Sequence, residues 1–139
     1  MTCTFFGHSD APETLEPLLE QTLREHIENQ TADRFYVGHN GNFDRMAERA
    51  LKKLQERFPQ IQAYTVLAYL PRPGESYLLP TIYPEGLEAV PPRFAIYARN
   101  RWMISQSGMC VTYVVRPFGG AAKFKERAKQ KGLCMIELE

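Results

Sequence analysis

Turns rich in glycine and polar residues follow several apolar runs of the sequence, and they are the places where chemistry is expected. Glycine lets backbone N–H groups approach a ligand closely, and the first turn of a helix carries about half a positive charge. Phosphate is therefore the group that such strand-to-helix turns favour. The candidate segments are Gly7-His8-Ser9-Asp10, Gly38-His39-Asn40-Gly41-Asn42, residues 71–92, and Arg116-Pro117-Phe118-Gly119-Gly120 with Ala121.

The glycine spacing excludes the two best-known phosphate motifs. Neither the Gly-x-Gly-x-x-Gly pattern of dinucleotide-binding proteins nor the P-loop pattern of NTPases is present. Plain turn geometry accounts for any one of these glycines by itself. Their weight as evidence therefore depends on whether the turns meet at one edge of a sheet.

Charged side chains near these turns have both a structural and a functional interpretation. Asp44 falls in the first turn of a helix, where a carboxylate either complements the helix dipole or holds a ribose hydroxyl. Arg99 and Asn100 fall inside another helix, and arginine is suited to bidentate contact with phosphate. Glu126 stands among lysines on the last helix, where a surface ion pair is the simpler interpretation.

Residues 71–92 form a long proline-rich segment that holds six of the ten prolines. Loops of this length within a domain are usually lids, binding loops or disordered segments. The aromatic residues favour an ordered flap, so Tyr83 and Glu85 are expected to close over the ligand.

Cysteine and histidine usage predicts neither a metal nor a cofactor. The three cysteines, Cys3, Cys110 and Cys134, show no Cys-x-x-Cys spacing, and each lies in a run typical of a buried strand. They are expected to be structural thiols. The three histidines have no His-x-x-x-His pattern that would group zinc ligands.

Composition is that of an ordinary globular protein, with 139 residues, 44% hydrophobic residues and a net charge of +1. We expect a single domain over residues 1–139, located in the cytoplasm, because no secretory leader or membrane-length apolar run is present. Charge is uneven: residues 1–92 hold 8 Lys and Arg against 13 Asp and Glu, whereas residues 93–139 hold 9 against 3. The last third is therefore where an anion site is expected, although a solvated basic helix face gives the same count.

Hydrophobic periodicity predicts strands that alternate with helices. Alternation of this kind indicates a mostly parallel sheet with helices on both faces, and ligands then bind outside the carboxyl ends of the strands. We expect a Rossmann-like three-layer α/β/α sandwich with a five-stranded sheet, of order 3-2-1-4-5 in preference to 2-1-3-4-5. The predicted strands are 2–6, 34–38, 62–70, 109–115 and 133–138, and the predicted helices are 15–27, 43–58, 92–106 and 121–131. Thr14 is expected to cap the first helix. In the third helix, the residues expected in the core are Phe94, Tyr97, Ala98 and Trp102.

Several of these motifs resemble a small bacterial family of unknown function in the SMF/DprA–LOG (SLOG) superfamily. The resemblance extends over almost the whole chain and implies a Rossmann-like fold with a site for a nucleotide or nucleotide-derived ligand. The segments that carry it are Thr2-Cys3-Thr4-Phe5-Phe6-Gly7-His8, Phe35 to Asp44, Val66-Leu67-Ala68-Tyr69-Leu70-Pro71, Tyr83-Pro84-Glu85-Gly86, Arg99-Asn100-Arg101-Trp102-Met103 and Gly119-Gly120-Ala121-Ala122.

Two other branches of the superfamily define the alternatives. Cytokinin-activating phosphoribohydrolases of the lonely-guy type have an arginine, paired glycines and a glutamate that match Arg99, Gly119-Gly120 and Glu126. If this chain hydrolyses nucleoside monophosphates, Arg99 holds the substrate and Glu126 supports the ribosyl centre. Asn100, however, replaces their lysine, and Phe118, Ala122 and Lys123 replace the proline, third glycine and threonine of their motif.

The DNA-processing DprA branch shares Arg99-Asn100-Arg101 and binds single-stranded DNA. Its additional domains are absent here, and Trp102 is expected in the core rather than stacked on bases. DNA binding is therefore the weaker alternative. The preferred hypothesis is a monomer or homodimer that binds a nucleotide-class ligand for sensing or regulation. In it, phosphate lies over Gly119-Gly120-Ala121 and the sugar lies near Gly38 to Asp44.

Overall fold

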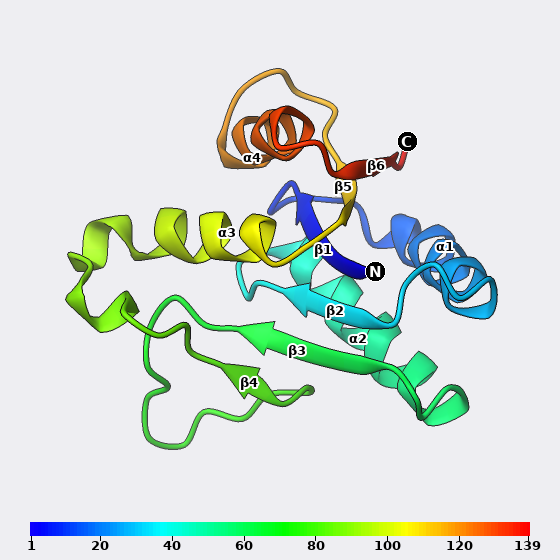
Figure 1. The fold of residues 1–139 in the computed structure, drawn as a ribbon, viewed down its shortest axis with the longest axis horizontal. Coiled ribbons are helices and arrows are strands. Elements are labelled where there is room, and N and C mark those ends of the chain that lie inside the picture. Colours follow the sequence, from blue (N-terminus) through cyan, green and yellow to red (C-terminus); the bar gives the residue numbers. More distant parts are fainter.

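The computed structural model describes residues 1–139 as one parallel sheet between two layers of helices (Figure 1). The sheet has the order β4-β3-β2-β1-β5-β6, and every neighbouring pair is parallel. The chain thus reverses its direction of winding between β1 and β5. The elements are β1 (Thr2–Gly7), α1 (Glu16–Glu28), β2 (Arg34–Val37), α2 (Asn42–Arg57), β3 (Gln62–Val66), β4 (Thr81–Ile82), α3 (Ala95–Ser105), β5 (Met109–Tyr113), α4 (Gly120–Gln130) and β6 (Cys134–Glu137).

The expectation of five strands was wrong, because the sheet has six. The five expected strands do take the preferred order, and the additional one, β4, extends the edge beside β3. It pairs only through Thr65 with Thr81 and Val66 with Ile82. This strand has only two residues, Thr81 and Ile82, and prolines at positions 80 and 84 flank it. Two residues are too few for a periodic signal, so only the edge of β3 defines the strand.

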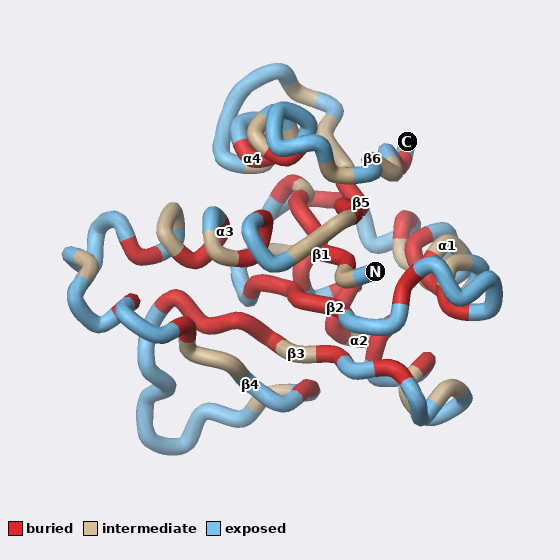
Figure 2. The backbone as a smooth tube through the Cα atoms, viewed as in Figure 1, coloured by how far each residue is buried: buried red, intermediate tan, exposed pale blue.

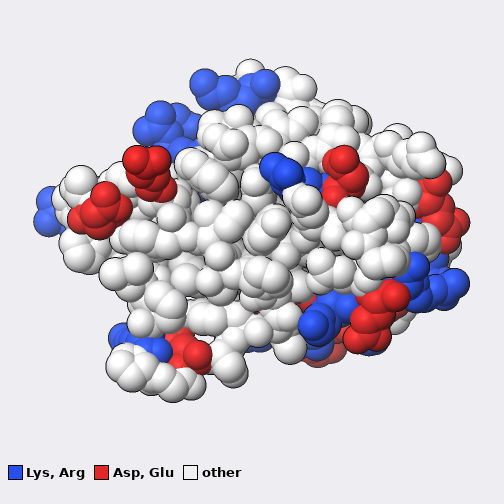
Figure 3. Space-filling model, turned by 60° about the horizontal axis from the view of Figure 1, so that its bottom comes forward, with Lys and Arg blue, Asp and Glu red and all other residues white.

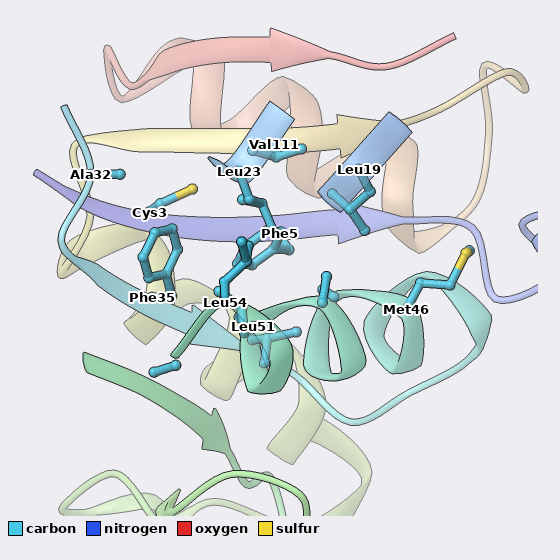
Figure 4. Packing of buried hydrophobic residues seen from close by; sticks show 14 of the residues in the cluster. Cys3, Phe5, Leu19, Leu23, Ala32, Phe35, Met46, Leu51, Leu54 and Val111 are labelled. Atoms are coloured by element: carbon cyan, nitrogen blue, oxygen red, sulfur yellow. The ribbon is translucent and has the colours of Figure 1, made fainter. Parts of the chain in front are cut away.

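Alternating side chains of the central strands build a core on each face of the sheet. Cys3 and Phe5 on β1 face α1 and α2, whereas Phe6 faces α3 and α4. This period of two is what a strand buried on both sides requires. Figure 4 shows the first core, where Leu19 and Leu23 of α1 and Leu51 of α2 meet Phe5. Figure 2 shows that burial is concentrated in β1, β2 and the adjoining helix faces.

Helix boundaries differ from the expected ones at two N-termini. Thr14 is not the N-cap of α1, because a 3-10 turn over Glu13–Leu15 precedes the helix and Pro17 follows Glu16 directly. Similarly, Pro92 belongs to a short 3-10 turn and α3 begins at Ala95. Proline lacks an N–H, and it is accommodated in the 3-10 turn at Pro92 and in the first turn of α1 at Pro17, where no helical bond is lost.

The core prediction for α3 is confirmed only in part, because Tyr97 and Trp102 pack against the core at its margin. Phe94 is half exposed and Tyr97, Ala98 and Trp102 are only partly buried, whereas Arg99 and Asn100 are buried. Burial thus follows Ala95, Arg99, Asn100 and Met103, a regular helical face that contains two polar residues. The free thiol of Cys134 is also exposed, because β6 is an edge strand. No helix is long and apolar enough to cross a membrane.

The hydroxyl of Thr112 on β5 is buried without a hydrogen-bond partner. An unpaired buried hydroxyl destabilises the folded state. We expect Thr112→Val to raise the free energy of unfolding by about 1 kcal/mol, since valine replaces the hydroxyl with a methyl group of similar size. Urea denaturation measures the change. Thr112→Ser, which keeps the hydroxyl and removes the methyl, should lower stability, and a less stable valine variant would contradict the assignment.

Candidate functional site

A cavity of about 330 Å³ lies at the carboxyl edge of the sheet where the winding reverses, and we call it the main cavity because most of the expected site residues line it. This is the edge that the arrowheads of β2 and β3 mark in Figure 1. It is lined by the end of β1, the turns that follow β2 and β5, and one face of α3. Three of the four sequence segments singled out as candidate turns therefore meet at one place, as parallel strands with a common edge require. The residues shared with the expected site are Gly7, His8, Asn40, Asp44, Arg99, Asn100, Gly119, Gly120 and Ala121.

Arg99 is the buried cation at the centre of this edge, with only 2% of its surface exposed. Its guanidinium donates to the Val66 carbonyl at 2.9 Å, to Asn100 Oδ1 at 2.7 Å and to Asn40 Oδ1 at 2.5 Å. It has no carboxylate within ion-pairing distance, and burial lowers its pKa while Asp44 opposes that change. A guanidinium has five N–H donors, so one on each terminal nitrogen remains for a ligand.

Glycines at three positions near Arg99 and Asp44 allow close packing. A Cβ on Gly38 would lie 3.0 Å from Asp44 Oδ2 and 3.1 Å from Arg99 Cζ. A Cβ on Gly7 would overlap the Phe43 ring at 2.2 Å. Gly41 has a φ of +97°, and its Cβ would lie 2.5 Å from the backbone of Ser9. The turns after β1 and β2 can therefore approach each other only with glycine at these positions.

Asp44 is a buried carboxyl group in the first turn of α2, where it accepts a hydrogen bond from the Asn40 N–H at 2.9 Å. Burial raises its pKa to about 6, although the Asn40 N–H and Arg99 favour the ionised form. Asp44 thus already supplies negative charge at the N-terminus of α2. An anionic ligand group is accordingly disfavoured there.

The N-terminus of α4 has no carboxylate beside it that corresponds to Asp44 at α2. Its N-cap is Gly119, with a φ of +93°, and no side chain caps the helix and no acidic residue stands in its first turn. Because the first intrahelical bond comes from the Lys123 N–H to the Gly119 carbonyl, the N–H groups of Gly120 and Ala121 have no acceptor in the helix. These groups open on the main cavity.

His8 orders the turn that leads into α4. Its Nε2 accepts hydrogen bonds from the backbone N–H groups of Val115 and Arg116 at 3.0 and 3.2 Å, so its proton resides on Nδ1. Burial and the neighbouring Arg116 lower its pKa, which keeps the ring neutral. Nδ1 has no hydrogen-bond partner within the protein, and His8 lines the main cavity. Arg116 itself is paired with Asp10 at 2.8 Å.

Basic side chains gather at one part of the surface. Lys and Arg lie close together at the upper left of the face in Figure 3, whereas basic and acidic side chains are mixed at its lower right. On α4, Glu126 is the only acidic residue among Lys123, Lys125, Arg127 and Lys129. This helix therefore adds positive potential on its side of the cavity.

The remaining expected site residues lie elsewhere. His39 is bonded to Glu48 at 3.0 Å and lies outside the main cavity, and the Asn42 side chain donates to the Ala11 carbonyl at 3.3 Å. Tyr83 and Glu85 do not line the cavity, because their segment follows β4 at the far edge of the sheet. Glu126 lines a neighbouring surface hollow rather than the cavity that contains Arg99.

Sequence reasoning did not select Ile96 and Met103, which also line the cavity. With Arg99 and Asn100 they have the i, i+3, i+4, i+7 spacing of one helix face, so the signal was present. It was outweighed by Tyr97 and Trp102, whose rings were expected to face the core. Ser9, Arg116 and Phe118 belong to the expected turns but were not selected either.

Comparison with known proteins adds no further identification. No protein-family model matches this sequence, and no curated protein is significantly similar to it.

The raised pKa of Asp44 makes stability depend on pH with a definite sign. The ordinary value is 3.8 and the folded value is about 6, so the folded state holds this proton more tightly. As pH rises from about 4 to 7, the unfolded chain releases the proton first and stability falls. Between pH 4 and pH 7, the free energy of unfolding of the wild type should fall by on the order of 3 kcal/mol because of this group, and Asp44→Asn should not show that fall. Urea denaturation at pH 4 and pH 7 measures the difference.

Asp10 serves as the control of opposite sign, because its hydrogen bond with Arg116 lowers its pKa. Asp10→Asn should therefore lose stability relative to the wild type as pH rises. Parallel pH profiles for wild type and Asp44→Asn would contradict the burial argument for Asp44.

Proposed function

We propose that this protein binds a nucleotide or nucleotide-derived ligand in the main cavity and uses it for sensing or regulation. One observation carries the proposal: the uncapped N-terminus of α4 and the buried, incompletely bonded Arg99 open on the same cavity. Backbone N–H groups at a helix N-terminus and a guanidinium are both well suited to phosphate. In the proposed complex, phosphate lies over Gly119-Gly120-Ala121.

The sugar is assigned to the opposite wall, near Gly38 to Asp44. Asp44 and Asn40 supply acceptor oxygens for ribose hydroxyls there, and negative charge on Asp44 would repel a phosphate. The volume of about 330 Å³ falls in the range of small-molecule sites, and apolar side chains such as Ile96, Met103 and Phe124 accompany the polar groups. This mixture favours an amphiphilic ligand over a bare inorganic anion.

Membership in the SLOG superfamily is part of this proposal. Arg99-Asn100 and Gly119-Gly120 are among the segments that resemble the superfamily, and all four residues line the cavity. The parallel sheet and its flanking helices are consistent with a Rossmann-like fold.

Binding is favoured over hydrolysis because of the position of Glu126. A hydrolase of the lonely-guy type would need this carboxylate beside the ligand held by Arg99, but Glu126 is exposed and lines a different hollow. Binding of single-stranded DNA has less support as well. Trp102 packs against Tyr36 in the core, with ring centroids 5.1 Å apart, as expected of a ring with a structural role.

Gly120 offers a sharp test of phosphate binding. A Cβ there meets nothing within 4 Å, and aspartate is favourable in a first helical turn, so Gly120→Asp should fold normally. Its carboxylate would occupy the proposed phosphate position and repel the phosphate group. We expect Gly120→Asp to weaken binding of nucleoside monophosphates at least tenfold, as measured by isothermal titration calorimetry.

Gly120→Ala is the matched control and should change affinity less than twofold. Binding by the wild type should also stabilise the protein in thermal-shift assays, by about 2.7 kcal/mol at a ligand concentration 100 times its dissociation constant. No response to a panel of nucleoside monophosphates, or equal affinity in the aspartate and alanine variants, would refute the proposed phosphate position.

A further inference from the structure

A second, smaller hollow adjoins the main cavity, and we call it the side hollow. Its volume is about 210 Å³, and it is formed by the segment after β3, the loop that follows, and His39. Asn40 and Arg99 line both spaces. Asn40 and Arg99, which are hydrogen-bonded to each other, thus belong to the wall that the two spaces share, and a ligand that crosses this wall would occupy both.

Aromatic side chains surround the side hollow without being required by the core. Tyr69 remains 49% exposed and Leu70 66% exposed, and the loop is among the most exposed parts of the chain (Figure 2). The rings of Tyr69 and Tyr77, which both line the side hollow, are nevertheless held in place. The Tyr69 hydroxyl donates to the Pro92 carbonyl at 2.8 Å, and the Tyr77 ring packs edge-on against His39 with centroids 5.0 Å apart. Fixed, accessible rings of this kind provide surfaces on which a planar heterocycle can stack.

Two polar groups in the side hollow are hydrogen-bond acceptors. Glu75 accepts from the Tyr77 hydroxyl at 2.6 Å and from the Arg72 N–H at 3.1 Å, and these bonds lower its pKa. The carboxylate is thus ionised at neutral pH and keeps lone pairs free.

His39 contributes the second acceptor through a buried partner. Its Nδ1 lies 3.0 Å from Oε1 of Glu48, which is 3% exposed and also accepts from the Thr65 hydroxyl at 2.9 Å. Because the Glu48 carboxylate accepts from Nδ1, the neutral tautomer of His39 carries its proton on Nδ1 and has Nε2 as an acceptor. A group that donates N–H bonds complements both Nε2 and the Glu75 carboxylate.

We propose that the side hollow binds a nucleobase with an exocyclic amino group, stacked against Tyr69 and Tyr77 and donating to Glu75 or His39. This inference rests on the proposed function, since it places the base of the same nucleotide whose phosphate lies at α4. Arg99 and Asn40 then lie beside the sugar, between the two ends of the ligand. The proposal makes the loop after β3, instead of Tyr83 and Glu85, the part of the chain that selects the ligand.

The test compares three ligands by isothermal titration calorimetry: AMP, purine riboside 5′-monophosphate and ribose 5-phosphate. The second differs from AMP only in lacking the amino group, and the third lacks the base. Stacking on an aromatic side chain is a substantial contribution to base binding. We expect AMP to bind at least tenfold more tightly than ribose 5-phosphate, and severalfold more tightly than the purine analogue.

Tyr77→Ala should remove most of the advantage of AMP while leaving affinity for ribose 5-phosphate unchanged. Leu78→Ala is the matched control, because Leu78 is exposed in the same loop but does not line the side hollow. It should leave the affinity for all three ligands unchanged. Circular dichroism and the unchanged ribose 5-phosphate affinity verify that Tyr77→Ala is folded.

The outcomes separate this inference from the proposed function. If ribose 5-phosphate binds as tightly as AMP, the base subsite is refuted and phosphate binding stands. Equal affinity for AMP and the purine analogue overturns recognition of the amino group. If neither AMP nor ribose 5-phosphate binds, the proposed function fails together with the subsite.

Discussion

The carboxyl edge of the sheet depends on the buried guanidinium of Arg99. It joins the end of β3 through Val66, the turn after β2 through Asn40, and its own helix through Asn100. Removing a cation from water without an ion-pair partner is costly, so these oxygen acceptors are what allow it to remain buried. The same requirement is the reason for proposing an anionic ligand, because the protein itself supplies only neutral acceptors to Arg99.

Packing around Arg99 explains why several glycines are needed near it. Gly38 leaves room for Asp44 and Arg99, Gly7 leaves room for the Phe43 ring, and Gly41 lies against Ser9. The turn after β5, where we propose that phosphate binds, has the opposite character, since Gly119 and Gly120 face open space. Similar glycine turns therefore have two functions here: those after β1 and β2 allow close packing, and the one after β5 leaves a helix N-terminus accessible.

Much of the fold could be predicted from local pattern. Apolar runs and helical spacing located the five longer strands and the four helices, because burial on both sides of a parallel sheet imposes these periods. The turns at the shared carboxyl edge, together with the first turn of α2 and one face of α3, placed nine of the expected site residues in one cavity. The exceptions are instructive: β4 exists only because β3 offers an unpaired edge, and α3 buries Arg99 and Asn100 in place of the partly buried Tyr97 and Trp102.

By itself, the sequence determined the alternation of strands and helices and the chemistry available after each strand, because both follow from residue type and spacing over a few turns. Tertiary structure alone decided which side chains share a space. It brought Arg99 to Asn40, 59 positions apart in the sequence. The residues that were expected at the main cavity but lie outside it are Tyr83, Glu85 and Glu126, and those that line the side hollow include Tyr69, Tyr77 and His39. The physical reason is that the rotation of a helix and the path of a loop are chosen by packing against distant strands, and this information is not contained in local periodicity.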